Sequence, residues 1–205
     1  MECKFIVIEG IDGSGKSTLA ANLEKYISQF FSCIKINEPT ELNIWGRELR
    51  KILRSKVKPD NQLSIKLRRL FRKDRLWDIQ NRIQPALLEK KIVILDRYYF
   101  STAAYQAISE ENADEIMKEY TEDKRILHPD CIFYLKIEPD YTLKRISARY
   151  GKEEIFENKE LLSRIYQHYE YIVKKYSKKY HIIKLDAYMN ENDLTQKALE
   201  ALGIR

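Results

Sequence analysis

The sequence feature that most constrains the fold is a glycine-rich segment near the start, Gly10-Ile11-Asp12-Gly13-Ser14-Gly15-Lys16-Ser17. It matches the pattern G-x-x-x-x-G-K-[ST] at every fixed position. Its glycines let the backbone turn several N–H groups toward one phosphate, and a following helix points its positive end at the same place. In such a loop the Lys16 amine reaches the β- and γ-phosphates, and the Ser17 hydroxyl is suited to Mg²⁺. The segment therefore predicts a phosphate loop.

The residues on either side of this loop supply the expected context. Before it, the run Cys3 to Ile8 is mostly apolar, as in a strand buried on both faces. After it, apolar residues recur at three- and four-residue spacing, which predicts an amphipathic helix packed on a sheet. These residues are Leu19, Leu23, Tyr26, Ile27 and Phe30. Strand, loop and helix thus follow one another as a phosphate loop requires.

The rest of the chain alternates short apolar runs with helical patterns. The runs predict strands at Cys33–Ile36, Ile92–Leu95, Ile132–Leu135 and His181–Leu185. Helices are predicted at Trp45–Arg54, Leu63–Lys90 with a kink or break at Pro85, Asp140–Arg149, Glu157–Lys179 and Asp193–Leu202. This alternation predicts an α/β fold with a five-stranded parallel sheet flanked by helices on both faces. At 205 residues, we expect one domain spanning 1–205.

Composition narrows the class of protein. With 33% charged and 44% hydrophobic residues, the chain is expected to be globular. Its apolar runs are too short for a transmembrane span or a signal-peptide core. Cys3, Cys33 and Cys131 form an odd set without a C-x-x-C pair, which predicts thiols in a reducing cytoplasm rather than disulfides or a zinc site.

Positive charge is concentrated in one stretch. Between Arg47 and Arg75 there are twelve Lys or Arg residues against three Asp or Glu. Such a stretch beside a phosphate loop favours polyanionic small molecules, with nucleic acid as the competing interpretation. Because Leu49, Leu53, Leu63, Leu67 and Leu70 recur with helical spacing, most of the charge is expected on a solvated face, and nucleic-acid binding is the less favoured reading.

Polar residues follow each predicted strand, where ligands bind in parallel α/β sheets. Strand two is followed by Glu38 and Pro39, strand three by Asp96 and Arg97, and strand five by Asp186. Asp96, after an apolar strand in a phosphate-loop protein, is placed to hold Mg²⁺ through water.

Several motifs in the same order and spacing resemble the bacterial thymidylate kinase family. They are Glu9 to Thr18, Phe71 with Asp74-Arg75, Asp96-Arg97-Tyr98, Ser101-Thr102, Ala104-Tyr105-Gln106 and Pro129-Asp130. The resemblance covers essentially the whole chain. It implies a Mg²⁺-dependent enzyme that transfers a phosphoryl group from ATP to dTMP, giving dTDP and ADP, and it implies a homodimer.

The resemblance also implies roles for individual residues. ATP would be bound by the loop from Gly10 to Thr18, namely Gly10, Ile11, Asp12, Gly13, Ser14, Gly15, Lys16, Ser17 and Thr18, with Ser17 and Asp96 on the metal. Asp12 would hold the acceptor's 3′-hydroxyl, and Arg50 with Arg97 would clamp its phosphate. Around the nucleoside it implies Phe71 stacking on thymine, Arg75 beside the base, Thr102 reading its edge and Tyr105 excluding a 2′-hydroxyl. Glu38, Pro39 and Gln106 complete the substrate-binding set.

The phosphate loop carries no arginine between Gly10 and Lys16. In this subfamily the cation for the transition state comes from a mobile lid, which corresponds here to about 145–157, with Arg145 and Arg149 as catalytic candidates beside Lys16, Arg97 and Asp12. The chain departs from the family pattern at two places, Ile155 and the pair Arg72-Lys73 beside Phe71. A kinase of another nucleoside monophosphate is therefore the alternative function.

Overall fold

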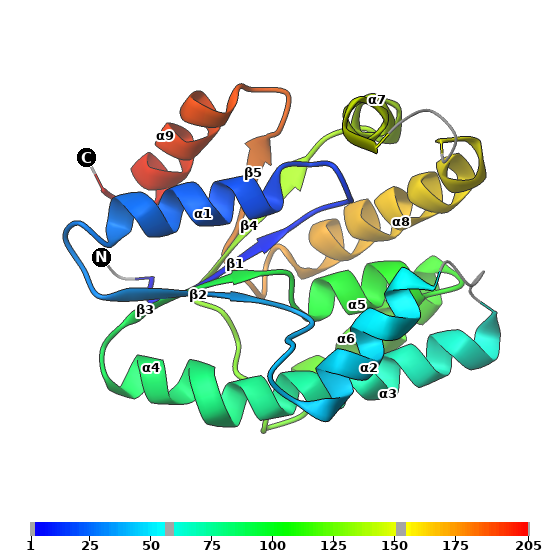
Figure 1. Ribbon diagram of the computed structural model, residues 1–205, viewed down its shortest axis with the longest axis horizontal. Coiled ribbons are helices and arrows are strands. Elements are labelled where there is room, and N and C mark those ends of the chain that lie inside the picture. Colours follow the sequence, from blue (N-terminus) through cyan, green and yellow to red (C-terminus); the bar gives the residue numbers. More distant parts are fainter. Residues whose placement is uncertain (1–2, 56–59, 151–154, 205) are drawn as a thin grey trace.

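At the centre of the computed structural model, five short segments form one parallel sheet (Figure 1). The strands are β1 (Phe5–Glu9), β2 (Cys33–Asn37), β3 (Ile92–Asp96), β4 (Cys131–Lys136) and β5 (Ile182–Asp186). The structure describes residues 3–55, 60–150 and 155–204, without the side chains of 149, 150 and 155–158. Every residue of β1 and β3 is buried, as their contiguous apolar residues predict.

The strand order brings the ends of three strands together. The order is β2-β3-β1-β4-β5, so β1 lies between β3 and β4. Ile8 of β1 and Asn37 of β2 are both in register with Asp96 of β3. Consequently the phosphate loop, Glu38 and Arg97 follow three neighbouring strands at the same end of the sheet.

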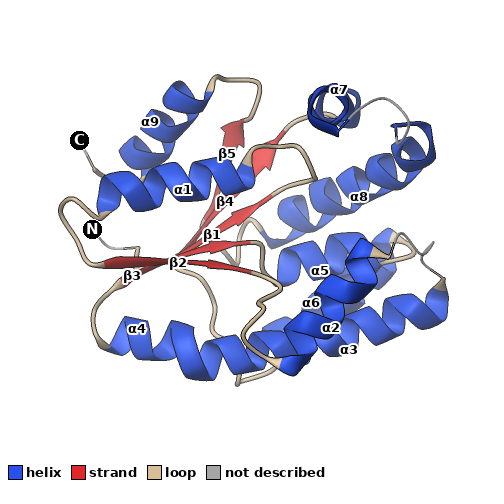
Figure 2. Cartoon of the chain, viewed as in Figure 1, coloured by secondary structure: helices blue, strands red, loops and turns tan. Residues whose placement is uncertain are grey.

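Helices cover both faces of the sheet, which confirms the predicted α/β class. Figure 2 shows α1 (Lys16–Ile27) and α9 (Glu191–Ala201) on one side of the strands. On the other side lie α3 (Asn61–Asp78), α4 (Gln84–Leu88), α5 (Tyr99–Gln106), α6 (Glu110–Thr121) and α8 (Ile155–Tyr176). The helix α2 (Ile44–Arg54) packs on α3, and α7 (Pro139–Tyr150) follows β4. Among the helices of the described ranges, none is long and apolar enough to cross a membrane.

The long helical region predicted from Leu63 to Lys90 is interrupted before Pro85. A π-helical turn, η1 (Ile79–Ile83), joins α3 to α4, and its end is marked by the Gln84 N–H donating to the Ile79 carbonyl. Proline cannot donate a hydrogen bond, and its ring crowds the preceding turn. The wider π-helical turn before Pro85 accommodates that crowding. The predicted kink is therefore a π-helical turn.

Two helices and two residues differ from the prediction. The sequence patterns predict neither α5 nor α6. They predict Phe30 in the first helix and Leu53 on an apolar face, whereas α1 ends at Ile27 and these residues are 63% and 50% exposed. The twelve residues of α1 extend about 18 Å, at about 1.5 Å per residue, which matches the length of a five-residue strand at about 3.3 Å per residue. Phe30 therefore lies in the turn toward β2, and Leu53 lies at the outer end of α2.

Candidate active site

The phosphate loop joins β1 to α1 through glycines in conformations that other residues avoid. Gly10, Gly13 and Gly15 have φ angles of 147°, 76° and 98°. A Cβ on Gly10 would lie 2.9 Å from the Leu135 carbonyl oxygen, and one on Gly13 would lie 3.1 Å from Thr142. The loop thus needs glycine both for its turns and for its packing against β4 and α7. Because Gly15 is the N-cap of α1, the helix opens directly onto the loop.

Lys16 lies folded into this loop. Its Nζ donates to the Ile11 carbonyl at 2.7 Å and is 3.4 Å from Ser14 Oγ. Burial, together with the positive charge of Arg97, lowers the pKa of Lys16 to about 8. An anion bound in the loop would offset both effects and raise the pKa of Lys16 again.

Ser17 and Asp96, predicted to share a metal, meet at the strand ends. Ser17 Oγ donates to Asp96 Oδ2 at 2.5 Å. The other carboxylate oxygen, Asp96 Oδ1, is buried without a hydrogen-bond partner in the described part of the chain. One carboxylate, one hydroxyl and phosphate oxygens are the usual Mg²⁺ ligand set, with water completing the shell. Within the described residues, no cluster of three or more His, Cys, Asp or Glu could hold a metal alone. The residues therefore fit Mg²⁺ that arrives with a nucleotide.

Arg97 connects the loop to α5. Its Nη2 donates to Asp12 Oδ1 and to the Tyr105 hydroxyl, the latter at 3.1 Å. The guanidinium carbon also lies 4.9 Å from the centre of the Tyr105 ring. Desolvation alone would raise the pKa of Asp12, but Arg97 and Lys16 outweigh it and hold that pKa below its ordinary value. Three residues predicted to contact the acceptor are thus brought together.

Arg75 and Glu38 form a second, buried cluster. Two hydrogen bonds from Arg75 Nε, at 3.1 and 3.0 Å, and one from Nη2 at 2.5 Å reach the Glu38 carboxylate. Nη2 also donates to Thr102 Oγ1 at 3.2 Å. The rings of Tyr98 and Tyr120 each lie 4.8 Å from the guanidinium carbon. Burial disfavours the cation, but Glu38 and these rings raise the pKa of Arg75 above its ordinary value. Arg75 Nη1 is buried without a hydrogen-bond partner among the described residues.

The remaining substrate candidates surround these clusters. Phe71 is half-buried on α3, one helical turn before Arg75. Arg50 Nη2 donates to the Pro39 carbonyl at 2.5 Å, and its Nε is 3.3 Å from Glu41. Arg50 and Arg97, predicted as one clamp, are therefore engaged with different partners. Gln106 is buried at the end of α5, while Ile11 is buried and Thr18 half-buried at the base of the loop.

The predicted lid is described only in part. On α7, Thr142 and Ile146 lie against Gly13. Arg145 points elsewhere, since its Nη2 donates to the Ala187 carbonyl after β5 at 2.9 Å. The side chain of Arg149 and residues 151–154 lie outside the described residues, as does the side chain of Ile155.

The sequence is similar to those of known proteins. A family model described as thymidylate kinase matches residues 8–196. The chain belongs to the thymidylate kinase family. Thymidylate kinases from Leptospira interrogans (serovar copenhageni) and Leptospira borgpetersenii are 38% and 36% identical to it. Each alignment covers 96% of this chain, with 92% and 91% of those proteins. The thymidylate kinase of Brachyspira hyodysenteriae is 36% identical over 80% of this chain and 78% of its own. The predicted resemblance is confirmed.

The departure from the thymidylate kinase pattern at Arg72-Lys73 has a simple structural account. Arg72 Nη2 donates to Asp123 Oδ2 at 2.5 Å, and Lys73 Nζ lies 6.0 Å from the Trp45 ring centre. Arg72 is thus paired with the residues after α6, and Lys73 is directed toward α2. Arg72 also lies 5.9 Å from the centre of the Tyr120 ring, on which Arg75 packs, but neither Arg72 nor Lys73 is paired with a residue that the family pattern places around the base.

Sequence reasoning missed Glu9, which belongs to the thymidylate kinase motif but received no role. It is fully buried and accepts hydrogen bonds from Tyr98, Ser101 and Tyr169. Burial raises its pKa above the ordinary value, against the opposing effects of Ser101, Arg97 and Tyr169. A carboxylate inside an otherwise apolar strand was the available signal, since buried acids occur where donors meet them.

Proposed function

We propose that this site performs the reaction of the thymidylate kinase family, phosphoryl transfer to dTMP, with ATP as the donor and Mg²⁺ as the metal. The observation that carries the proposal is the meeting of two groups of residues at one loop. Ser17 and Asp96 are hydrogen-bonded beside Lys16, and Arg97 binds Asp12 and Tyr105 while its charge also acts on Lys16. The first set suits a polyphosphate with its metal, and the second suits a monophosphate ester.

On the donor side, the backbone of the loop and Lys16 would hold the β- and γ-phosphates. Ser17 and Asp96 would hold Mg²⁺, which neutralises charge on the transferred group. The unpartnered Oδ1 of Asp96 supports this role, because a buried carboxylate oxygen without a donor is costly unless a ligand reaches it.

On the acceptor side, Arg97 would exchange its contact with Asp12 for the phosphate of dTMP, leaving Asp12 for the 3′-hydroxyl. Arg75 Nη1, buried and unpartnered in the described chain, would donate to a carbonyl oxygen of the base. Phe71 would stack on thymine, and Thr102, with Glu38, Pro39 and Gln106, would complete the pocket wall. Tyr105 would fill the space that a ribose 2′-hydroxyl needs. Arg50 would reach the phosphate after releasing Pro39 and Glu41.

We also propose that residues 1–205 act as one domain whose lid, at about 145–157, supplies the transition-state cation. Because Arg145 is engaged with Ala187, Arg149 is the first candidate. Arg149→Ala should then lower kcat much more than it raises KM for dTMP. An unchanged kcat would assign the role to Arg145 or Lys152.

Ranking kcat/KM for dTMP, dUMP, dCMP, dGMP and UMP in a coupled assay tests the acceptor. The contacts of Arg72 and Lys73 away from the base support dTMP as the best substrate. dUMP should be weaker by a factor of about 10 to 200, since one methyl in an apolar pocket is worth about 1–3 kcal/mol. Ribonucleotides should be poorer still. A preference for another monophosphate would replace dTMP and leave the kinase reaction intact.

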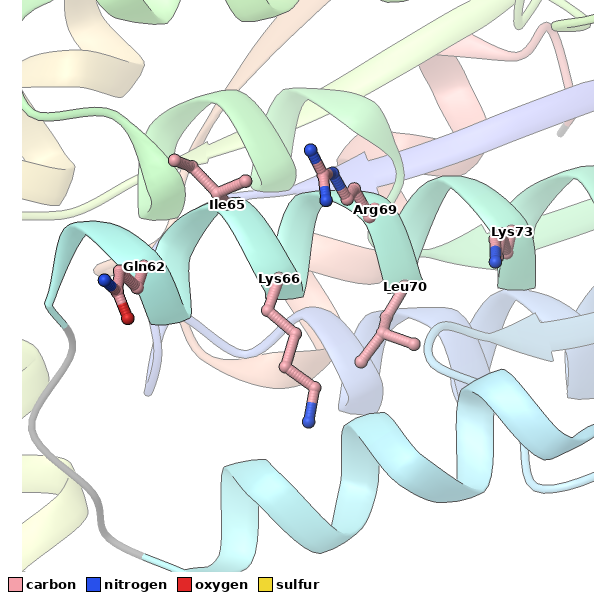
Figure 3. A pocket seen from close by; sticks show the side chains of 6 residues that line it. All are labelled: Gln62, Ile65, Lys66, Arg69, Leu70 and Lys73. Carbon is pink, nitrogen blue, oxygen red and sulfur yellow. The ribbon is translucent and has the colours of Figure 1, made fainter.

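We further propose a homodimer, as the resemblance implies, and a cytoplasmic location, as three cysteines without a C-x-x-C pair suggest. A hollow of about 430 Å³ runs along the outer side of α3, and Figure 3 shows the residues that line it, among them Ile65 and Leu70. Ile65 is 47% exposed. Burying such side chains would favour association. Light scattering on the wild type and on Ile65→Asp would show a dimer that the substitution weakens.

A further inference from the structure

Glu9 is a buried carboxylate that the proposed reaction leaves without a task. It ends β1, immediately before the phosphate loop. Its Oε1 accepts from the backbone N–H groups of Tyr98 and Ser101, at 2.8 and 3.2 Å. The N-cap of α5, Tyr98, provides no side-chain cap of its own. Glu9 therefore caps α5 from the end of β1. The side chain of the N-cap residue normally makes these contacts.

The second carboxylate oxygen meets two hydroxyl groups. Glu9 Oε2 accepts from Ser101 Oγ at 2.6 Å and from the Tyr169 hydroxyl at 2.9 Å. These hydroxyls are themselves 2.7 Å apart. Each hydroxyl has one proton, so a carboxylate at this position draws the Ser101 proton toward itself. The lone pairs of Ser101 Oγ are then left for other donors.

One of those donors is Arg97. Arg97 Nη1 donates to Ser101 Oγ at 3.1 Å and to the Gly10 carbonyl at 3.3 Å. Nη1 is thus held by the framework, whereas Nη2 contacts Asp12 and Tyr105. Arg97 also has a φ angle of 72°, in the left-handed region. A non-glycine backbone persists in this region only where the surrounding structure fixes it.

We propose that Glu9, acting through Ser101, is a positioning residue that holds the Nη1 edge of Arg97 so that its Nη2 edge meets the acceptor phosphate. The inference rests on the proposed role of Arg97. Glu9 itself does not touch substrate. Its charge sets the direction of the Ser101 hydroxyl, and that direction makes Ser101 an acceptor for Arg97.

The test uses two variants that each remove one hydroxyl from Glu9 Oε2. Ser101→Ala also removes a contact of Arg97, whereas Tyr169→Phe removes none. Calorimetry would give the dissociation constants of dTMP and thymidine. The ratio of the thymidine constant to the dTMP constant measures what the phosphate contributes to binding. We expect Ser101→Ala to reduce that ratio about tenfold, the usual effect of losing a hydrogen bond to a charged group. Tyr169→Phe should leave the ratio unchanged.

Glu9→Gln separates charge from shape. Oε1 accepts two backbone N–H groups, so the amide oxygen must occupy that position and the NH₂ group must face Ser101 and Tyr169. Ser101 Oγ would then accept from Gln, which takes one of its two lone pairs, and its proton would turn toward Tyr169 or Arg97. We expect this variant to reduce the ratio, by less than Ser101→Ala does, with thymidine binding retained.

Arg97→Ala distinguishes a failure of the proposed role of Arg97 from a failure of the positioning role of Glu9. If it leaves the ratio unchanged, the proposed role of Arg97 fails, whatever the other variants show. If it lowers the ratio while Ser101→Ala and Glu9→Gln do not, the positioning role of Glu9 is overturned. Equal losses in Ser101→Ala and Tyr169→Phe, or parallel losses of dTMP and thymidine binding, would indicate general loosening and would also overturn it. Should Ser101→Ala fail to fold, Glu9→Gln decides alone.

Discussion

Lys16 lies folded into the glycine-rich loop, where its amine donates to the Ile11 carbonyl at 2.7 Å. Binding of ATP would transfer this amine from a neutral carbonyl to charged oxygens. We therefore expect Lys16→Ala to lower kcat at least about 100-fold, as is typical when an electrostatic stabiliser is removed. Lys25→Ala, an exposed lysine on the same helix, is the matched control and should be unaffected. Near-normal turnover by a folded Lys16→Ala protein would contradict the proposed ATP site.

Asp78 gives a pH-dependent prediction. Its Oδ1 accepts from Arg82 at 3.2 Å, while Oδ2 is buried without a partner in the described ranges. Burial, aided by the charge of Asp74, raises its pKa from 3.8 to about 6 against the opposing charges of Arg82 and Arg75. The folded state therefore holds this proton more tightly than the unfolded state. Ionisation of Asp78 costs stability above about pH 6, and the cost disappears as the pH falls toward 4.

Urea unfolding of the wild type and of Asp78→Asn across this range measures the effect. The wild type should lose up to about 3 kcal/mol relative to the variant as the pH rises from 4 to 7. Acidic groups away from Asp78 contribute equally to both proteins and cancel in the difference, whereas Glu38 and Asp74, which interact with Asp78, add a smaller change of their own. A difference that stays flat across the range would show that Asp78 is ionised normally in the folded protein.

How far single residues could be predicted depended on where their partners lie. Ser17 and Asp96 were expected to meet because the ends of neighbouring parallel strands share one edge of the sheet. Glu9 could not be assigned in this way. Its partners Ser101 and Tyr169 are 92 and 160 residues away, and both come from helices rather than strand ends. No local pattern records which hydroxyls reach a given carboxylate.

Among the elements, α5 and α6 were missed for different reasons. Nearly all of α5 is buried, Ser101 and Thr102 included, so no polar face marks its helical period. In contrast, α6 carries an interpretable pattern. Ala113, Ile116, Met117 and Tyr120 share its buried face, and Ser109 caps its first turn by accepting from the Asn112 N–H. Helix α5 therefore could not be predicted from its sequence pattern, whereas α6 could have been predicted from its apolar spacing and its Ser109 cap.

The connection between β2 and α2 is fixed by close packing around Gly46. Asp74 accepts from the Thr40 N–H at 3.0 Å and from Asn43 Nδ2 at 2.7 Å. A Cβ on Gly46 would lie 2.1 Å from the Thr40 carbonyl oxygen and 2.6 Å from Asp74 Oδ1. This connection carries Glu38, the partner of Arg75. Its shape therefore bears directly on the proposed base site.

Gly46→Ala tests this packing. Helix propensity alone would favour alanine within α2 by about 1 kcal/mol. We expect instead a loss of at least about 2 kcal/mol of unfolding free energy, because the clash involves backbone atoms. KM for dTMP should rise with it. A more stable protein with unchanged KM would show that Thr40 and its neighbours move aside freely.

At the scale of the whole molecule, the basic stretch is neutralised by acids that lie outside it or near its ends. Ion pairs join Arg54 to Glu41, Lys66 to Glu48, Arg68 to Glu119, Arg72 to Asp123 and Arg75 to Glu38. In the linear sequence the stretch looked like a nucleic-acid site, because most of its acidic partners lie elsewhere in the chain, in or after α6 and just before α2. The fold thus pairs five of these cations with acids, Arg75 in the interior and the others at or near the surface, which favours the small-molecule site.

This pairing leads to a prediction about polyanions. With a net charge of +6, the protein should bind heparin only weakly, because counterion release requires cations that are free to meet phosphates or sulfates. Glu119→Gln with Asp123→Asn frees Arg68 and Arg72 on one face. Glu191→Gln with Asp193→Asn makes the same change of net charge on α9, across the sheet, and leaves the Lys197–Glu200 ion pair intact. The first pair should elute from heparin at clearly higher salt than the second. Equal elution would mean that net charge alone governs retention, and tight wild-type binding that dTMP abolishes would place the polyanion in the acceptor site.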